Sequence, residues 1–127
     1  MSTYVDTSAF MKFVLDEPRS AALASYLDQS DEPLVSSILL ETEARRAALR
    51  AGVPQDAVTR VLRAVTLNEM PRSLFHEAGA LADPMLRTPD ALHVASAVRL
   101  GVRQVLTYDD RMAAAAASVG LSVVAPA

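Results

Sequence analysis

The sequence has 127 residues, of which 51% are hydrophobic, and a formal net charge of −3. This length and composition suit one domain with a buried core, so we expect a single domain over residues 1–127. The negative charge argues against a general nucleic-acid binder, and the absence of cysteine excludes disulfides, zinc–thiolate sites and thiol nucleophiles.

The N-terminus has no basic region followed by an apolar run, which argues against a signal peptide. The most apolar stretch, Met112 to Gly120, is far shorter than a membrane span. We therefore expect a cytoplasmic protein with no membrane partner.

Helical segments alternate with short apolar segments along the chain, a pattern that predicts a parallel sheet covered by helices. Ser37 is the expected N-cap of a helix that Gly52 stops. For the first half we expect strands at Thr3–Val5 and Leu34–Ser36, and helices at Ser8–Leu15, Arg19–Gln29, Ser37–Arg50 and Pro54–Val65.

In the second half, Thr88 is the expected cap of a helix that has Pro89 in its first turn and Gly101 after its end. Either Asp109 or Asp110 caps the last helix. We expect helices at Leu74–Leu86 (ended or kinked by Pro84), Thr88–Leu100 and from the cap to Val119, with strands at Thr66–Leu67, Gln104–Thr107 and Leu121–Val124.

Asp6 directly follows the first expected strand, and Asp109 follows the fourth. In an open α/β sheet, ligands bind outside the carboxyl ends of the strands. No basic residue lies within five positions of Asp6, which favours a cation over an ion pair as its partner. The alternative for both aspartates is that they only cap the helices that follow them.

Two further carboxylates belong to expected helices. Glu43 borders an apolar helix face, where a carboxylate needs a partner; Arg46, Arg50 or a metal ion could provide one. Asp90 lies in the first turn of its helix, where an acidic side chain is favourable without any further function. Glu41 precedes Arg45 by four residues and is expected to pair with it on the surface.

Three or four carboxylates in one crevice repel one another unless a cation is present. Hard ions such as Mg²⁺ and Mn²⁺ take oxygen ligands, and such sites activate water for phosphodiester cleavage. If four carboxylates hold metal ions, the rest of the chain carries −3 + 4 = +1. The glycines form no nucleotide-binding loop.

Four blocks of the sequence carry a resemblance to a known family. They are Val5-Asp6-Thr7-Ser8-Ala9, Ser36-Ser37-x-Leu39-x-x-x-Glu43, Arg87-Thr88-Pro89-Asp90-Ala91-Leu92-His93-Val94-Ala95-Ser96-Ala97 and Leu106-Thr107-Tyr108-Asp109. Together they resemble the PIN domain, in particular the VapC toxins of bacterial toxin–antitoxin pairs. The resemblance covers essentially the whole chain, and the block around Asp90 is its most specific part.

The resemblance implies a PIN-like α/β fold, with a parallel five-stranded sheet flanked by helices on both faces. It also implies a Mg²⁺- or Mn²⁺-dependent endoribonuclease that cleaves RNA, forms a homodimer and is inhibited by a cognate antitoxin protein. The acidic quartet of the family would map to Asp6, Glu43, Asp90 and Asp109, with Asp110 a less favoured choice for the last. Thr107 and Ser8 would hold a carboxylate or a water molecule by hydrogen bonds.

Other residues have both a functional and a structural interpretation. His93 is expected on the packed side of its helix as a structural histidine. Arg87 could contact RNA or pair with Asp83. Arg46 could contact RNA from an arginine-rich helix edge or be solvated. Tyr4 and Tyr108 are interpreted as packing groups.

Three alternatives remain at this stage. A phosphoacceptor receiver domain would need a lysine near its last strand, whereas the only lysine is Lys12. A catalytically silent PIN-like binding module would keep the fold without turnover. A PIN-domain nuclease of RNA processing, or one acting on DNA, would use the same site on another substrate.

Overall fold

The computed structural model describes all 127 residues and contains one five-stranded sheet in the order β3-β2-β1-β4-β5. Every neighbouring pair of strands is parallel, as the alternating pattern predicts. The strands are β1 (Thr3–Val5), β2 (Leu34–Ser37), β3 (Val65–Asn68), β4 (Gln104–Leu106) and β5 (Ser122–Val124).

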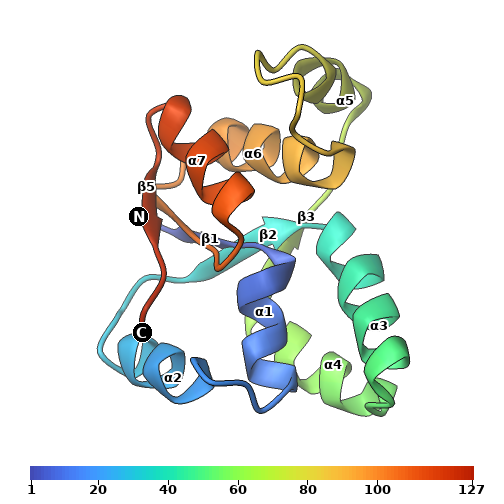
Figure 1. Cartoon of the computed structure of the whole chain (residues 1–127), viewed down its shortest axis with the longest axis vertical. Helices are drawn as coiled ribbons and strands as arrows, with labels where there is room; N and C mark the ends of the chain where they lie inside the picture. Colours follow the sequence, from blue (N-terminus) through green and yellow to red (C-terminus); the bar gives the residue numbers. More distant parts are fainter.

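Helices cover both faces of this sheet (Figure 1). They are α1 (Thr7–Val14), α2 (Ser20–Asp28), α3 (Leu39–Ala51), α4 (Gln55–Leu62), α5 (Arg72–Gly79), α6 (Thr88–Leu100) and α7 (Asp110–Ser118). None of them is long and apolar enough to cross a bilayer. The predicted fold class, a parallel five-stranded sheet with helices on both faces, is confirmed.

Strand β1 shows how the sheet separates two cores. Side chains on a strand alternate between its faces, and both Tyr4 and Val5 are fully buried. Val5 packs in the core formed by α1 to α4, together with Phe10 and Leu40. Tyr4 packs in the core beneath α6 and α7, together with Met112.

Helix α6 is buried on two sides, because α5 packs on its outer surface. Seven consecutive residues, Ala91 to Ala97, are buried, and a small third core joins Leu74 and Ala78 of α5 to Leu92 of α6. In Figure 1, α5 accordingly lies beyond α6 as seen from the sheet. The segment of α6 from Ala91 to Ala97 is therefore surrounded by protein.

Two predicted caps are wrong. Ser37 is the last residue of β2 rather than the N-cap of α3; its backbone N–H and Oγ both lie within hydrogen-bonding distance of Tyr4 Oη, so its hydroxyl does not serve the helix. Thr88 is the first residue of α6, and the N-cap is Arg87, which makes no side-chain capping bond.

Some predicted boundaries also differ. The helix expected over Leu74–Leu86 is α5, which ends at Gly79. The backbone N–H of Ala80 closes it by bonding back to His76 and Glu77. Helix α4 ends at Leu62 rather than Val65, because Val65 begins β3. This strand is the one expected at Thr66–Leu67, longer by one residue at each end.

The strand order places a crevice at the ends of β1 and β4. From β1 the chain builds β2 and β3 on one side and then crosses to build β4 and β5 on the other. Ligands of such sheets bind at this reversal, outside the carboxyl ends of the strands. Val5 and Leu106 are paired in register, so Asp6 and Thr107 follow side by side.

Candidate active site

Asp6 lies at the centre of this crevice and is only 4% exposed. Its Oδ1 accepts hydrogen bonds from the backbone N–H of Ala9 (3.0 Å) and from Ser8 Oγ (2.7 Å). Its Oδ2 accepts one from Thr107 Oγ1 (2.5 Å). Burial raises the pKa of Asp6, and these bonds only partly offset that rise. Asp6 therefore caps α1, as the structural interpretation requires, and is also a buried carboxylate.

Ser8 and Thr107, predicted to support a carboxylate, both contact Asp6. Ser8 Oγ also accepts the backbone N–H of Tyr108 (2.9 Å), and Thr107 Oγ1 accepts that of Asp109 (3.1 Å). These bonds join the segment after β4 to the segment after β1. Both hydroxyls thus fix the orientation of Asp6.

Asp109 and Asp110 differ in position. Asp109 is the N-cap of α7, with Oδ1 accepting the backbone N–H of Met112 (2.9 Å), and its Oδ2 lies 3.8 Å from an Nη atom of Arg87. Asp110 begins α7 and is exposed. Asp109 therefore shares Arg87 with Asp90, whereas Asp110 forms no ion pair.

Glu43 approaches from α3. Its Oε1 accepts hydrogen bonds from Thr7 Oγ1 (2.7 Å) and pairs with His93 Nε2 (2.6 Å). Burial raises the pKa of Glu43, but His93 and Thr7 outweigh that effect and hold it below its usual value. Arg46 and Arg50, the partners considered from the sequence, are exposed and form no ion pair with Glu43. Glu41 pairs with Arg45 as predicted.

His93 lies on the packed side of α6, as predicted, and is only 2% exposed. Its Nδ1 is 2.7 Å from Tyr4 Oη. Burial lowers the pKa of His93, but Tyr4 and Glu43 outweigh burial and raise it to about 10. The contact with Glu43 was not predicted. The spacing Asp90-x-x-His93, which places both side chains on one helix face, is the signal that could have revealed it.

Asp90 lies in the first turn of α6, and its side chain is 15% exposed. Its Oδ2 is buried and accepts no hydrogen bond. Burial, followed by repulsion from Asp109, raises its pKa, and Glu43 adds to the rise, while Arg87 and His93 oppose it. Asp109 and Glu43 are therefore both close enough to Asp90 to disfavour its charge.

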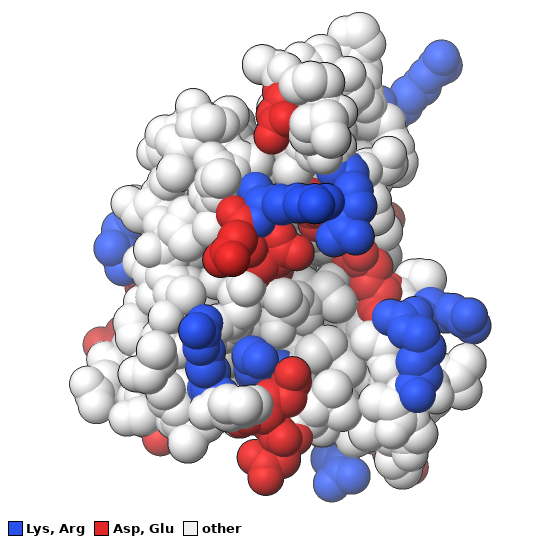
Figure 2. Space-filling model, in the orientation of Figure 1, with Lys and Arg blue, Asp and Glu red and all other residues white.

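Arg87 lies across the opening of this cluster instead of pairing with Asp83. Its Nε is 3.7 Å from Asp90 Oδ2, and the same side chain reaches Asp109. Its side chain is 64% exposed. Figure 2 shows blue side chains along the edge of a red cluster in the middle of this face, with further blue side chains over α3. An exposed cation thus borders the carboxylates.

The oxygen donors suit a hard divalent ion, although as the side chains lie no three carboxylate or imidazole groups are arranged to bind one ion together. Mg²⁺ usually keeps several waters and is bound through one or two carboxylates. Asp90 Oδ2, buried without a donor, is the oxygen that most needs a cation. The residues therefore fit such an ion.

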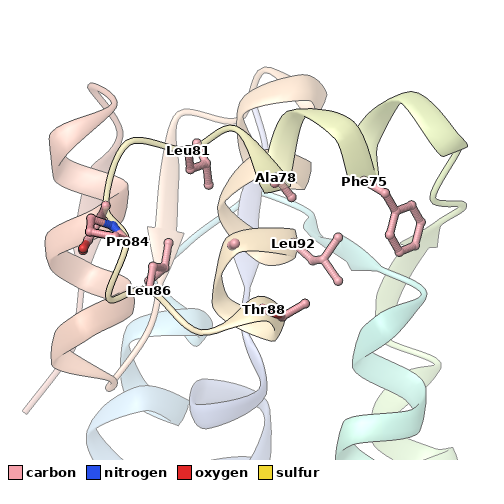
Figure 3. A pocket seen from close by; sticks show the side chains of 10 residues that line it. Phe75, Ala78, Leu81, Pro84, Leu86, Thr88 and Leu92 are labelled. Atoms are coloured by element: carbon pink, nitrogen blue, oxygen red, sulfur yellow. The ribbon is translucent and has the colours of Figure 1, made fainter.

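A cavity of about 270 Å³ lies next to the site, between α5, the 80–87 loop and the start of α6 (Figure 3). Its walls include Phe75, Leu81, Leu86 and Leu92, and Asp83 is its only carboxylate. None of the four predicted acidic residues lines it. It is a hollow of mixed polarity on the outer side of α6, separate from the acidic crevice.

In a comparison with protein families, the PIN domain model matches residues 3–118. The chain belongs to the PIN-domain family. The match includes all four predicted acidic residues, Asp6, Glu43, Asp90 and Asp109, and excludes the receiver-domain alternative. The resemblance noted in the sequence is thereby confirmed.

Known proteins agree with this assignment. The chain is 42% identical to ribonuclease VapC46 of Mycobacterium tuberculosis strain H37Rv over 126 residues, 97% of this chain and 96% of that protein. The structure is similar to that of VapC20 of M. tuberculosis, a toxin that cleaves the sarcin–ricin loop (TM-score 0.80, 16% identity, 98% of this chain and 100% of that one). It is also similar to a chain of the VapBC2 complex from Rickettsia felis bound to a promoter DNA fragment (TM-score 0.79, 11% identity, both chains covered completely). Both structural similarities concern the fold.

Proposed function

We propose that the chain is a metal-dependent endoribonuclease that acts as the toxin of a toxin–antitoxin pair. In this proposal Asp6, Glu43, Asp90 and Asp109 hold Mg²⁺ or Mn²⁺, directly or through water. The observation that carries it is the buried, unbonded Oδ2 of Asp90 beside two other carboxylates at the reversal point of the sheet. Identity to a named VapC ribonuclease over nearly the whole chain supports the reaction class.

The carboxylates of the chain have different parts in this proposal. Asp6 is held by three donors in a fixed orientation, and Glu43 by Thr7 and His93. Asp90 and Asp109 lie at the open side of the crevice, next to Arg87. The chemistry that a divalent ion supplies when bound here is a lowered pKa for water and stabilisation of charge on phosphate oxygens.

Two arginines suit the substrate. Arg87 is the guanidinium nearest to the carboxylates and can bind two phosphate oxygens at once. Arg46 is exposed on α3, the helix that carries Glu43. We assign both to RNA phosphates on either side of the scissile bond, with Arg87 closer to it.

The partners follow from the same assignment. The structural similarity to a chain of a VapBC complex supports a cognate antitoxin protein as partner. We also propose a cytoplasmic location and a homodimer as the assembly of the toxin.

The test is cleavage of a mixed RNA pool by the purified protein with Mn²⁺, Mg²⁺ or EDTA. We expect cleavage that EDTA abolishes, and products with 5′-phosphate and 3′-hydroxyl ends, because water rather than the ribose 2′-hydroxyl attacks. Asp6→Asn should lose at least about 100-fold of this activity. Asp110→Asn, which changes a neighbouring exposed carboxylate, should retain it. Cleavage that survives both EDTA and Asp6→Asn would contradict the proposal.

A further inference from the structure

His93 is a buried polar residue that joins four separate elements. From α6 it contacts Tyr4 of β1 through Nδ1 (2.7 Å) and Glu43 of α3 through Nε2 (2.6 Å). Tyr4 continues the network to Ser37 of β2 (3.2 Å). Such a network is retained only when each group is satisfied, since unpaired buried polar groups are costly.

The hydrogen-bond inventory fixes a proton on Nε2 of His93. A carboxylate can only accept hydrogen bonds, so at 2.6 Å from Glu43 Oε1 the imidazole is the donor. Thr7 Oγ1 donates to the same oxygen, Oε1 (2.7 Å). This assignment holds whether Nδ1 accepts from Tyr4 or donates to it.

The two donors act on one oxygen of Glu43 and leave the other free. Oε1 receives both hydrogen bonds, whereas no protein group donates to Oε2. With Oε1 fixed from α6 and α1, the direction of Oε2 is also fixed. Asp90 lies three residues before His93 and on the same face of α6, so His93 holds Glu43 on the face of α6 that also carries Asp90.

We propose that His93 is a positioning residue of the nuclease site, which holds Glu43 through Nε2 so that the second carboxylate oxygen faces the ion. This inference depends on the proposed function. It differs from a purely structural role for His93, in which the ring only packs in the core and contacts Tyr4. Groups that orient a metal-binding side chain typically change metal affinity by about 10- to 100-fold when removed.

A matched pair of variants separates the two interpretations. The amide of glutamine reaches the place of Nε2 and can still donate to Glu43, whereas the shorter asparagine reaches the place of Nδ1 and can only bond to Tyr4. Ser96→Ala is the control, because Ser96 is buried on the same helix and its hydroxyl has no partner. Tyr4→Phe tests the other end of the network.

The readouts are the Kd for Mn²⁺, measured by titration calorimetry without RNA, and the thermal unfolding of each variant in EDTA. We expect His93→Asn to raise the Mn²⁺ Kd by about 10-fold or more, and His93→Gln, Tyr4→Phe and Ser96→Ala to remain within about threefold of wild type. Equal Kd values for His93→Gln and His93→Asn, or a greater loss in His93→Gln, would overturn the inference even if both are less stable.

Failure of the proposed function gives a different result. If the wild-type protein neither binds Mn²⁺ nor cleaves RNA, the nuclease assignment is wrong, and the positioning role fails with it. If the wild type does both and the variant pair shows no difference, only the role of His93 is overturned.

Discussion

Asp6 and Asp90 are two carboxylates of the same crevice with opposite surroundings. Asp6 is nearly inaccessible, and both of its oxygens accept hydrogen bonds. Asp90 is also shielded, but its Oδ2 accepts no hydrogen bond. The cationic group next to it is Arg87, whose Nε lies 3.7 Å from Oδ2. Burial raises the pKa of both. The comparison indicates that Asp6 is already held by the protein, whereas Asp90 needs an added cation.

The largest effects are expected when each of these two carboxylates is replaced by an amide. Asp90→Asn should reduce RNA cleavage by at least about 100-fold and, in EDTA, raise the melting temperature by a few degrees, because it removes an unpaired charge beside Asp109. Asp6→Asn should instead lower stability in EDTA, by on the order of 1 kcal/mol, because it disturbs satisfied hydrogen bonds. Calorimetric unfolding of both variants measures the signs. The same sign in both would contradict the comparison.

The pH dependence of stability should sharpen the comparison of Asp6 with Asp90. When folding raises the pKa of a carboxyl, the unfolded chain loses that proton at a lower pH than the folded protein does. The free energy of unfolding therefore falls as pH rises from the pKa of the unfolded chain to the pKa of the folded protein. In EDTA, the stability gained by Asp90→Asn over wild type should therefore be absent at strongly acidic pH and grow as pH rises. Melting curves from about pH 3, below the usual aspartate pKa of about 3.9, up to about pH 8 would show this trend. A gain independent of pH would contradict the stated cause.

Arg87 borders Asp90 and Asp109 but not Asp6. Its replacement should therefore change metal binding and RNA cleavage less than Asp90→Asn does. Without the guanidinium near Asp90 and Asp109, Arg87→Ala should bind Mn²⁺ more tightly, by about threefold as expected for a partly exposed ion pair. The same variant should raise the KM for RNA. Opposite changes in these two constants are the diagnostic result. A weaker affinity for Mn²⁺ would show that Arg87 does not compete with the ion.

The smallest effect is expected at Arg46, which is exposed and has no contact with the carboxylates. Arg46→Ala should raise the KM for RNA less than Arg87→Ala does and leave the Kd for Mn²⁺ unchanged. Steady-state cleavage and metal titration on the same preparation provide both values. A changed metal affinity in this variant would argue against a role limited to RNA phosphates.

The fold could be predicted from local signals because most of them agree. Apolar strand segments, proline at the start of α6 and glycine at its end all point to one parallel sheet. The errors lie where tertiary contacts override a local rule. Ser37 has the sequence of a helix cap, but its hydroxyl is taken by Tyr4, a residue 33 positions away.

The candidate site could be predicted in its residues but not in its contacts. Two aspartates after strands and one at a helix start are visible in a sequence, since strand ends and helix caps are local features. The partner of Glu43 was not, because His93 is 50 positions away and reaches it only through the packing of α6 against the sheet. A search near Glu43 in the sequence finds Arg46 and Arg50, which lie on the exposed side of α3.

The central claim is that the acidic residues bind a divalent metal ion. Its most direct test is titration calorimetry with Mn²⁺, without RNA, on the metal-free wild type, Asp90→Asn and Asp110→Asn. The account predicts saturable binding in wild type and in Asp110→Asn, and its loss in Asp90→Asn, because the unbonded oxygen of Asp90 is the one that lacks a cation. Equal binding in all three proteins, or none in the wild type, would contradict it.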